Sequence, residues 1–179
     1  LDSGVKNVFV GYNTGNTVTS GDNNVAIGSE QTLTYLSSGN ANVAIGPSAL
    51  VLVTSGDYNI GIGQSAGYGI NEGSHNICMG YLSAYSANSG DYNIFIGYQA
   101  GRGTTATGNS NVGVGVNALQ GGLTSGNHNT AIGPTTMNGV TSGANNSAIG
   151  QDSGCTGSPG GQVTTGSNGI FLGDENISE

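Results

Sequence analysis

The octapeptide GNANVAIG spans Gly39–Gly46, and nine further copies of its pattern precede or follow it. The pattern is glycine, two variable residues, asparagine, a β-branched residue, a variable residue, a second aliphatic residue and glycine. The copies lie at residues 4–11, 21–28, 39–46, 56–63, 73–80, 90–97, 108–115, 126–133, 143–150 and 166–173. Eight of the nine intervals between closing glycines are 17 or 18 residues, so each copy should form one turn of a stacked structure.

The segment between the asparagine and the closing glycine predicts a short β-strand. Large and small side chains alternate in Val25-Ala26-Ile27, which is the period of two expected for a strand. Glycine at both ends allows the chain to reverse, because glycine reaches positive φ without steric cost. We therefore predict an all-β protein, a β-solenoid or β-roll with one 17–18-residue repeat per turn. The ten repeats fill residues 1–173, and residues 174–179 form a junction or tail.

Composition excludes several functional classes. Glycine supplies 35 of the 179 residues and charged residues only 7%, with a net charge of −8. Lys6 and Arg102 are the only cations, whereas nucleic-acid binding needs many such residues to neutralise phosphates. No apolar run approaches the roughly 20 residues of a membrane span. We therefore expect neither a nucleic-acid partner nor membrane insertion.

Asparagine recurs at the fourth position of nine copies. In a stack with one repeat per turn these amides would lie about 4.8 Å apart and could form a hydrogen-bonded ladder. The alternative is a surface array of amides that binds sugar or ice, and the ladder is the interpretation we favour. The predicted ladder consists of Asn7, Asn24, Asn42, Asn59, Asn76, Asn93, Asn111, Asn129 and Asn146.

The alternation within each strand also leads to a prediction about assembly. We expect the paired large residues, such as Val25 and Ile27, to face the interior. The residue between them is uncharged and mostly small, and a row of such residues would suit close approach of another chain. This predicts a homotrimer packed about an axial strip of Phe9, Ala26, Ala44, Gly61, Cys78, Phe95, Gly113, Ala131, Ala148 and Phe171.

The repeats resemble two families of fibrous proteins. Copies such as GNANVAIGPSAL (39–50) and GDYNIFIGYQAG (90–101) are similar to head repeats of trimeric autotransporter adhesins and to repeats in bacteriophage tail fibres. The resemblance implies a left-handed parallel β-roll assembled as a homotrimer, on a virion tail fibre or an extracellular surface. The repeat here is longer than in the adhesin heads, and no stalk, anchor or chaperone domain is recognised, which is typical of a fragment or a processed product.

No arrangement of residues indicates catalysis, so the chain is not expected to be an enzyme or to use a cofactor. His75 and His128 are three repeats apart and lack partner ligands, and no metal site is predicted. Cys78 and Cys155 are four to five repeats apart and are expected to be free thiols. Asp22, Asp57 and Asp91 share one repeat position but do not form the regular pattern of a calcium-binding roll.

Two functions remain open. The first is a structural or adhesive fibre segment that forms a rigid trimeric rod for attachment to a host or surface. The second is direct recognition of a host-surface glycan or protein receptor. Six of the eight tyrosines lie between residues 58 and 98, and stacked rings on an exposed face could contact a sugar. The predicted glycan contacts are Tyr58, Tyr81, Tyr92 and Tyr98.

Overall fold

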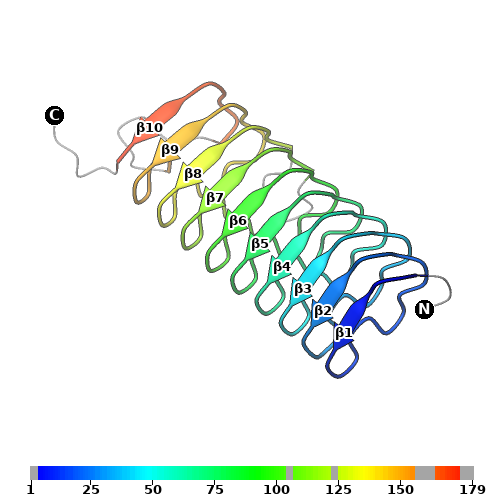
Figure 1. Ribbon diagram of the computed structural model, residues 1–179. Coiled ribbons are helices and arrows are strands. Elements are labelled where there is room, and N and C mark those ends of the chain that lie inside the picture. Colours follow the sequence, from blue (N-terminus) through cyan, green and yellow to red (C-terminus); the bar gives the residue numbers. More distant parts are fainter. Residues whose placement is uncertain (1–3, 104–106, 122–124, 156–163, 174–179) are drawn as a thin grey trace.

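The computed structural model describes residues 4–103, 107–121, 125–155 and 164–173. The predicted junction or tail at residues 174–179 lies outside this part of the chain. The described residues form ten three-residue strands, one in each copy of the repeat (Figure 1). The strands are β1 (Val8–Val10), β2 (Val25–Ile27), β3 (Val43–Ile45), β4 (Ile60–Ile62), β5 (Ile77–Met79), β6 (Ile94–Ile96), β7 (Val112–Val114), β8 (Thr130–Ile132), β9 (Ser147–Ile149) and β10 (Ile170–Leu172).

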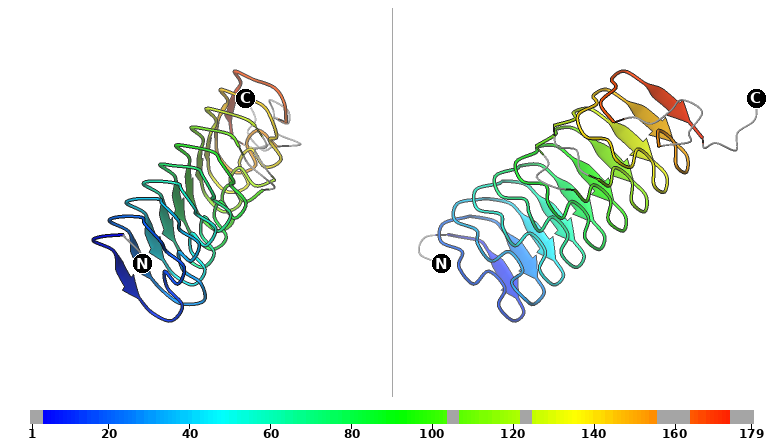
Figure 2. Two further views of the ribbon diagram at one scale, coloured as in Figure 1. Left: turned by 90° about the vertical axis from the view of Figure 1, so that its right-hand side faces the viewer. Right: turned by 180° about the vertical axis from the view of Figure 1, so that it is seen from behind.

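All ten strands form one parallel sheet in the order of the sequence. Equivalent residues pair in every case; for example, Val25 pairs with Val43 and Ala26 with Ala44. Each repeat and the segment that returns from its closing glycine make one turn, which we call a rung and number after its strand. The rungs stack into a rod with β1 and β10 at opposite ends (Figure 2). The chain is therefore a β-solenoid, as the repeat period predicts.

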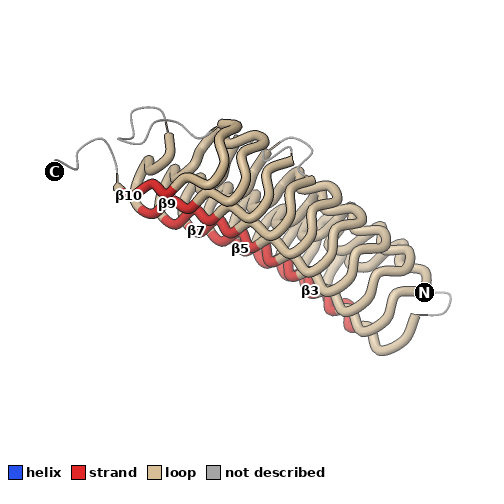
Figure 3. Tube along the Cα trace, turned by 90° about the horizontal axis from the view of Figure 1, so that it is seen from above, coloured by secondary structure: helices blue, strands red, loops and turns tan. Residues whose placement is uncertain are grey.

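The sheet makes up only one wall of the rod. Among the described residues, the part of each rung outside the sheet consists of turns and loops, and we call the part that follows the closing glycine the return segment (Figure 3). Backbone hydrogen bonds still join successive return segments, as from Gly67 N to Ser83 O at 2.8 Å. The turns therefore stack like the strands although they lack strand geometry. In the part of the chain that the structure describes, no helix is long and apolar enough to cross a bilayer.

The closing glycines are required by the spacing between rungs. Gly80 has a φ of +127°, outside the range that side chains tolerate well. A Cβ atom there would lie 2.5 Å from the carbonyl oxygen of Gly97 in the next rung. The positive φ and the close contact with the next rung both require glycine, which explains why glycine recurs so regularly in the sequence.

The return segments supply most of the large core residues. Leu50, Leu119 and Met137 lie four residues after their closing glycines and are almost completely buried. Their φ values are +49°, +54° and +49°, a left-handed conformation that costs roughly 1–2 kcal/mol per residue. Burying such a side chain contributes about 1.5–3 kcal/mol, which offsets this strain.

The two faces of each strand are reversed from the prediction. The residue at the strand centre points into the chain's own core: Ala26, Ala44, Cys78, Ala131 and Ala148 have no exposed surface, and Phe95 is 2% exposed. Gly61 and Gly113 are also buried, and Phe9 and Phe171 pack against the same core. The predicted axial strip is therefore wrong, because all ten residues line the interior of one chain.

The large residues on either side of the strand centre instead face outward. Ile27 and Ile149 remain 40% and 51% exposed, and their neighbours along the sheet are exposed or half-buried. The interior is narrow, and the return segments already place leucine and methionine in it. Small residues at the strand centre fill the remaining space, so the branched side chains are left outside.

Side-chain size is balanced across this core. Where the strand centre is Phe95, the fourth residue of the return segment is Gly101, and a Cβ there would lie 2.4 Å from the ring. Where the strand centre is Gly61, a Cβ would lie 2.7 Å from Leu50, which fills the space. Large residues thus pack beside small ones, as close packing requires.

Candidate functional site

A column of asparagine amides runs along the inside of the rod beside the sheet. Eight of the nine are at most 2% exposed or fully buried, and Asn7 in the first rung is half-buried. From Asn7 to Asn146, each Nδ2 donates to the Oδ1 of the preceding asparagine at 3.0–3.1 Å. The structure thus joins the nine residues into one continuous ladder.

Each inner amide uses its full hydrogen-bonding capacity. Asn76 donates from Nδ2 to Asn59 Oδ1 at 3.1 Å and to Gly90 O at 2.8 Å. Its Oδ1 accepts the backbone N–H of Asn93 at 2.9 Å and the Asn93 side chain at 3.1 Å. An amide has two donors and two acceptor lone pairs, and here all four are occupied. No hydrogen-bonding group is left to recognise a sugar, so this ladder is structural.

A second polar ladder lies at the second position of the repeat and was not predicted. Its side-chain oxygens accept the backbone N–H of the same position one rung earlier, as from Asp22 N to Asn40 Oδ1 and from Ser74 N to Asp91 Oδ1, at 2.6–3.1 Å. The signal was present in the sequence, because the acceptors are all Asp, Asn or Ser. They are Asp22, Asn40, Asp57, Ser74, Asp91, Asn109, Asn127 and Ser167.

The predicted glycan contacts fall into two separate stacks. Tyr58 and Tyr92 lie on either side of the His75 ring, with centroid distances of 5.0 and 4.8 Å. Tyr81 stacks on Tyr98 at 5.5 Å. All four tyrosines are exposed, Tyr92 at 60%.

These two stacks border the outward face of the sheet. The first occupies the third repeat position, before the strand, and the second follows the closing glycine. The structure therefore does not bring the four tyrosines into one cluster. It places them along opposite edges of the exposed apolar residues of rungs 4 to 6.

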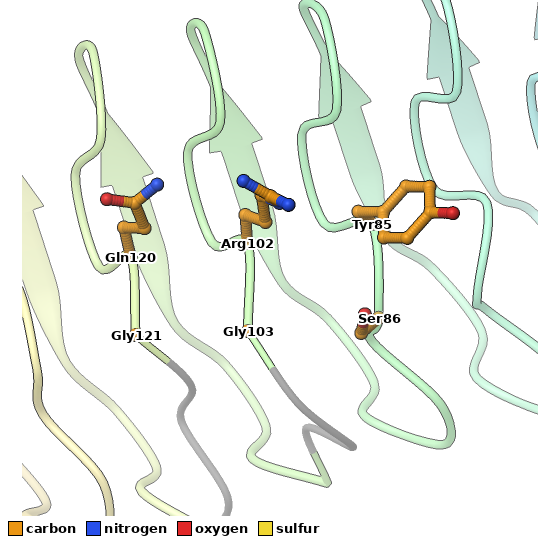
Figure 4. Close-up of a pocket in the computed structure, with 6 residues that line it drawn as sticks. All are labelled: Tyr85, Ser86, Arg102, Gly103, Gln120 and Gly121. Carbon is orange, nitrogen blue, oxygen red and sulfur yellow. The ribbon is translucent and has the colours of Figure 1, made fainter.

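A surface pocket lies on the return segments of rungs 5 to 7 (Figure 4). Its volume is about 310 Å³, and it is lined by Tyr85, Ser86, Arg102, Gly103, Gln120 and Gly121. Tyr85, Arg102 and Gln120 each lie five residues after a closing glycine, so they occupy equivalent places on consecutive rungs. In Figure 4 the Tyr85 ring points away from Arg102, and the pocket opens between them.

Tyr85 and Gln120 are held in place by neighbouring side chains. One face of Tyr85 stacks on Tyr68 of the preceding rung at a centroid distance of 5.0 Å. Gln120 donates from Nε2 to Gln99 Oε1 at 2.6 Å. Both residues also line the pocket. The sequence signal by which the pocket could have been found is a shared offset. Each of four residues lies five positions after a closing glycine: Tyr68, Tyr85, Arg102 and Gln120.

The charge around the pocket is positive although the chain is acidic. Arg102 is the only charged residue between Asp91 and Asp152 in the sequence, and its side chain is exposed. Asp91 already accepts the backbone N–H of Ser74, and Asp152 accepts the Thr135 hydroxyl. Arg102 is the only charged residue in the return segments of rungs 5 to 7, which line this pocket.

The histidines and cysteines do not come together. Among the described residues, no three His, Cys, Asp or Glu side chains are placed to hold a metal ion. Cys78 and Cys155 are free, and burial raises the pKa of the Cys78 thiol to about 12. A thiol with so high a pKa is protonated at neutral pH and is a poor nucleophile.

The chain was compared with protein-family models, curated proteins and solved structures. No family model, curated protein or solved structure matches it. The geometry of the rod and its surfaces must therefore carry the functional argument.

Proposed function

We propose that this chain is a structural and adhesive fibre segment that assembles as a parallel homotrimer through the outward face of its sheet. The rod would provide length and rigidity for attachment to a host or surface, on a virion tail fibre or another extracellular surface. The observation that carries the proposal is a strip of exposed and half-buried, mostly apolar side chains that runs along the whole sheet.

The strip contains the first and third residues of every strand. Eighteen of its twenty members are apolar, and none is charged. Its residues are Val8, Val10, Val25, Ile27, Val43, Ile45, Ile60, Ile62, Ile77, Met79, Ile94, Ile96, Val112, Val114, Thr130, Ile132, Ser147, Ile149, Ile170 and Leu172. A soluble monomer rarely exposes an apolar patch larger than a few hundred Å², and a larger patch marks an interface.

The size of the strip fits an interface between copies of this chain. Ten strands spaced by about 4.8 Å span roughly 43 Å, and the six residue steps from one tyrosine stack to the other span roughly 20 Å. The resulting face of about 860 Å² is close to the roughly 800 Å² that each partner buries in a stable complex. Because the strip has the length of the whole sheet, identical rods lying parallel to it would contact it along its full length.

Three chains are supported by the resemblance of the repeats to trimeric fibres. In a cyclic trimer the three sheets would face a common axis, and each strip would contact both neighbours. A rod of this kind suits a mechanical role, because each strand contacts only the strands of the adjacent rungs and two polar ladders run along its length.

The proposal is tested by the mass of the assembly and by one matched pair of variants. Light scattering should give about three times the chain mass of 17.6 kDa. Ile96 on the strip and Leu52 on the return segment are both 37% exposed. Ile96→Asp would place three carboxylates around the axis and should release folded monomers, whereas Leu52→Asp should leave the trimer intact. A wild-type monomer, or a trimer that tolerates Ile96→Asp, would refute the interface.

The exposed tyrosines support a second function, the direct recognition of a surface glycan. Tyr58, Tyr81, Tyr92 and Tyr98 present aromatic rings in ordered stacks, and an aromatic ring can pack against the apolar face of a sugar. In the proposed trimer these stacks would lie where neighbouring chains approach each other. A Tyr81→Ala variant that loses saccharide binding while its assembly keeps the wild-type mass would support this function.

A further inference from the structure

A second pocket extends the first one along the return segments. Its volume is about 370 Å³, and it is lined by Tyr35, Leu52, Thr54, Gly69, Asn71 and Asn88. Gly69 of the second pocket lies against the backbone of Tyr85 of the first, because a Cβ added at Gly69 would lie 2.6 Å from the carbonyl oxygen of Tyr85. Together they follow the rod from rung 2 to rung 7, which is about 24 Å at the spacing of parallel strands. We call this surface the return-segment groove.

The groove offers apolar surface and hydrogen-bonding groups side by side. Tyr35 and Leu52 are 46% and 37% exposed, and they lie next to the polar side chains of Thr54 and Asn71. Thr54 donates to Asn71 Oδ1 at 2.6 Å, so this polar pair is fixed in position. Saccharides present apolar ring faces edged by hydroxyl groups, and these two kinds of surface complement them.

At Arg102, the positive charge of the groove favours a ligand that carries a negative charge. A guanidinium binds a carboxylate through two parallel hydrogen bonds, and these are stronger than bonds between neutral groups. The return segments of rungs 5 to 7 contain no acidic residue, so an anion at Arg102 meets no carboxylate from these segments. Glu72, which is exposed and follows Asn71, lies on rung 4, in the other part of the groove. Tyr85 supplies a ring face beside this charge, and Gln120 supplies an amide already held by Gln99.

We propose that the return-segment groove binds an acidic polysaccharide lying along the rod, with a sugar ring against Tyr85 and a sugar carboxylate on Arg102. The elongated shape favours a polymer over a small molecule, and the single cation favours a sparsely charged sugar chain over a dense polyanion. The site goes beyond the fibre role and does not rest on it. All of its residues come from one chain, and none belongs to the apolar strip.

The test measures binding of an oligogalacturonate and of a neutral cello-oligosaccharide of the same length to the 179-residue chain by calorimetry. Sodium sulfate at matched charge serves as an anion without a sugar. The wild-type chain should bind the acidic oligosaccharide about fivefold more tightly than the neutral one, as expected for one exposed ion pair. It should not bind sulfate measurably under the same conditions.

Two variants with matched controls assign the binding to the groove. Arg102→Gln should remove the preference for the acidic probe, whereas Lys6→Gln removes the other cation and should change nothing. Tyr85→Ala should weaken binding of both oligosaccharides roughly three- to tenfold. Tyr12→Ala, at a tyrosine that is 77% exposed, should leave it unchanged. Tyr85→Phe retains the ring and should keep most of the affinity.

The outcomes are decisive in both directions. Equal binding of the acidic and neutral probes, or an acidic preference that survives Arg102→Gln, would overturn the proposal. So would sulfate binding that depends on Arg102 but not on Tyr85, because the site would then attract anions without recognising sugar. Circular dichroism of each variant establishes that it is folded, and Arg102 and Tyr85 are exposed and half-buried, so their replacement leaves the core untouched.

Discussion

The inner and outer faces of each strand differ in how their side chains are partnered and in how these vary from rung to rung, although consecutive residues of the strand lie on the two faces. On the inner face, the asparagines have all their hydrogen bonds filled and the strand centres match the return segment in size, as Phe95 matches Gly101. On the outer face, Ile94 and Ile96 repeat the aliphatic side chains of the equivalent residues in the adjacent strands, and they are half-buried and exposed, respectively.

The difference separates the determinants of folding from those of assembly. The inner face varies from rung to rung because each side chain is fitted to the one opposite. The outer face is uniform because an identical surface on another chain would have to match it along its whole length. Substitutions on the inner face should therefore change the stability of the single chain, and substitutions on the outer face should change the assembly.

The largest effect is expected from Asn76→Ala on the inner face. It removes the partners of the Asn93 backbone N–H, of one Asn93 Nδ2 hydrogen and of the Gly90 carbonyl. Each of these three buried unpaired groups costs about 1–3 kcal/mol, so the free energy of unfolding should fall by roughly 3–9 kcal/mol. Urea unfolding of a monomeric Ile96→Asp background measures this change.

The control for this prediction is Asn88→Ala. Asn88 is exposed, and its replacement should change the unfolding free energy by less than about 0.5 kcal/mol. Equal effects of the two substitutions would mean that the ladder does not stabilise the rod.

A double-mutant cycle tests the balance of size within the core. Phe95 is 2% exposed, and Phe95→Ala should destabilise the chain by roughly 3–5 kcal/mol. Adding Gly101→Leu recreates the pairing of Ala44 with Leu50 and should recover about half of this loss. Recovery stays partial because leucine at a φ of +64° costs roughly 1–2 kcal/mol.

Gly101→Leu alone should be destabilising, because its side chain would overlap the Phe95 ring. The coupling energy measured by urea unfolding should exceed about 2 kcal/mol. Additive effects of the two substitutions would show that the side chains at positions 95 and 101 do not fill the same space in the core.

The smallest effect at neutral pH concerns Cys78, whose contribution to stability changes only above pH 9. Burial raises its pKa from 9.0 to about 12, so the folded chain favours the neutral thiol. The unfolded thiol ionises above pH 9, and stability should fall by about 1.4 kcal/mol per pH unit between pH 9 and 12. Cys78→Ala should remove this part of the pH dependence. Identical pH profiles for the two chains would contradict the prediction.

The regular part of the fold was predictable from the sequence, and the orientation of the strand was not. The glycine period located every strand, including Val25–Ile27. Alternation shows that Ala26 lies opposite to Val25 and Ile27, but it does not show which face is buried. A better guide was available, because Asn24 and Ala26 are two residues apart and must share a face. A buried ladder therefore requires a buried Ala26.

The return segments were harder to interpret for a physical reason. Leu50 and Leu119 adopt positive φ, which local preferences disfavour for leucine, so only the packed structure accounts for their burial. Tyrosine clustering pointed to Tyr58 and Tyr81, whereas Tyr85 and Arg102 form the pocket because equal offsets on successive rungs place them side by side. Such an alignment becomes visible only when the rungs are superimposed.

Because equivalent residues pair on adjacent strands, the number of rungs determines the length of the rod. Val43 lies on Val25 and Ile60 on Val43, so any rung presents the same bonding pattern to the next one. Removing residues 64–80 would join Gly63 to Tyr81, so that the return segment of rung 5 connects β4 to β6. The bonding pattern would be unchanged, and the rod would shorten by about 4.8 Å. The distance spanned by such a fibre is thus encoded as a copy number, which gene duplication can change one unit at a time.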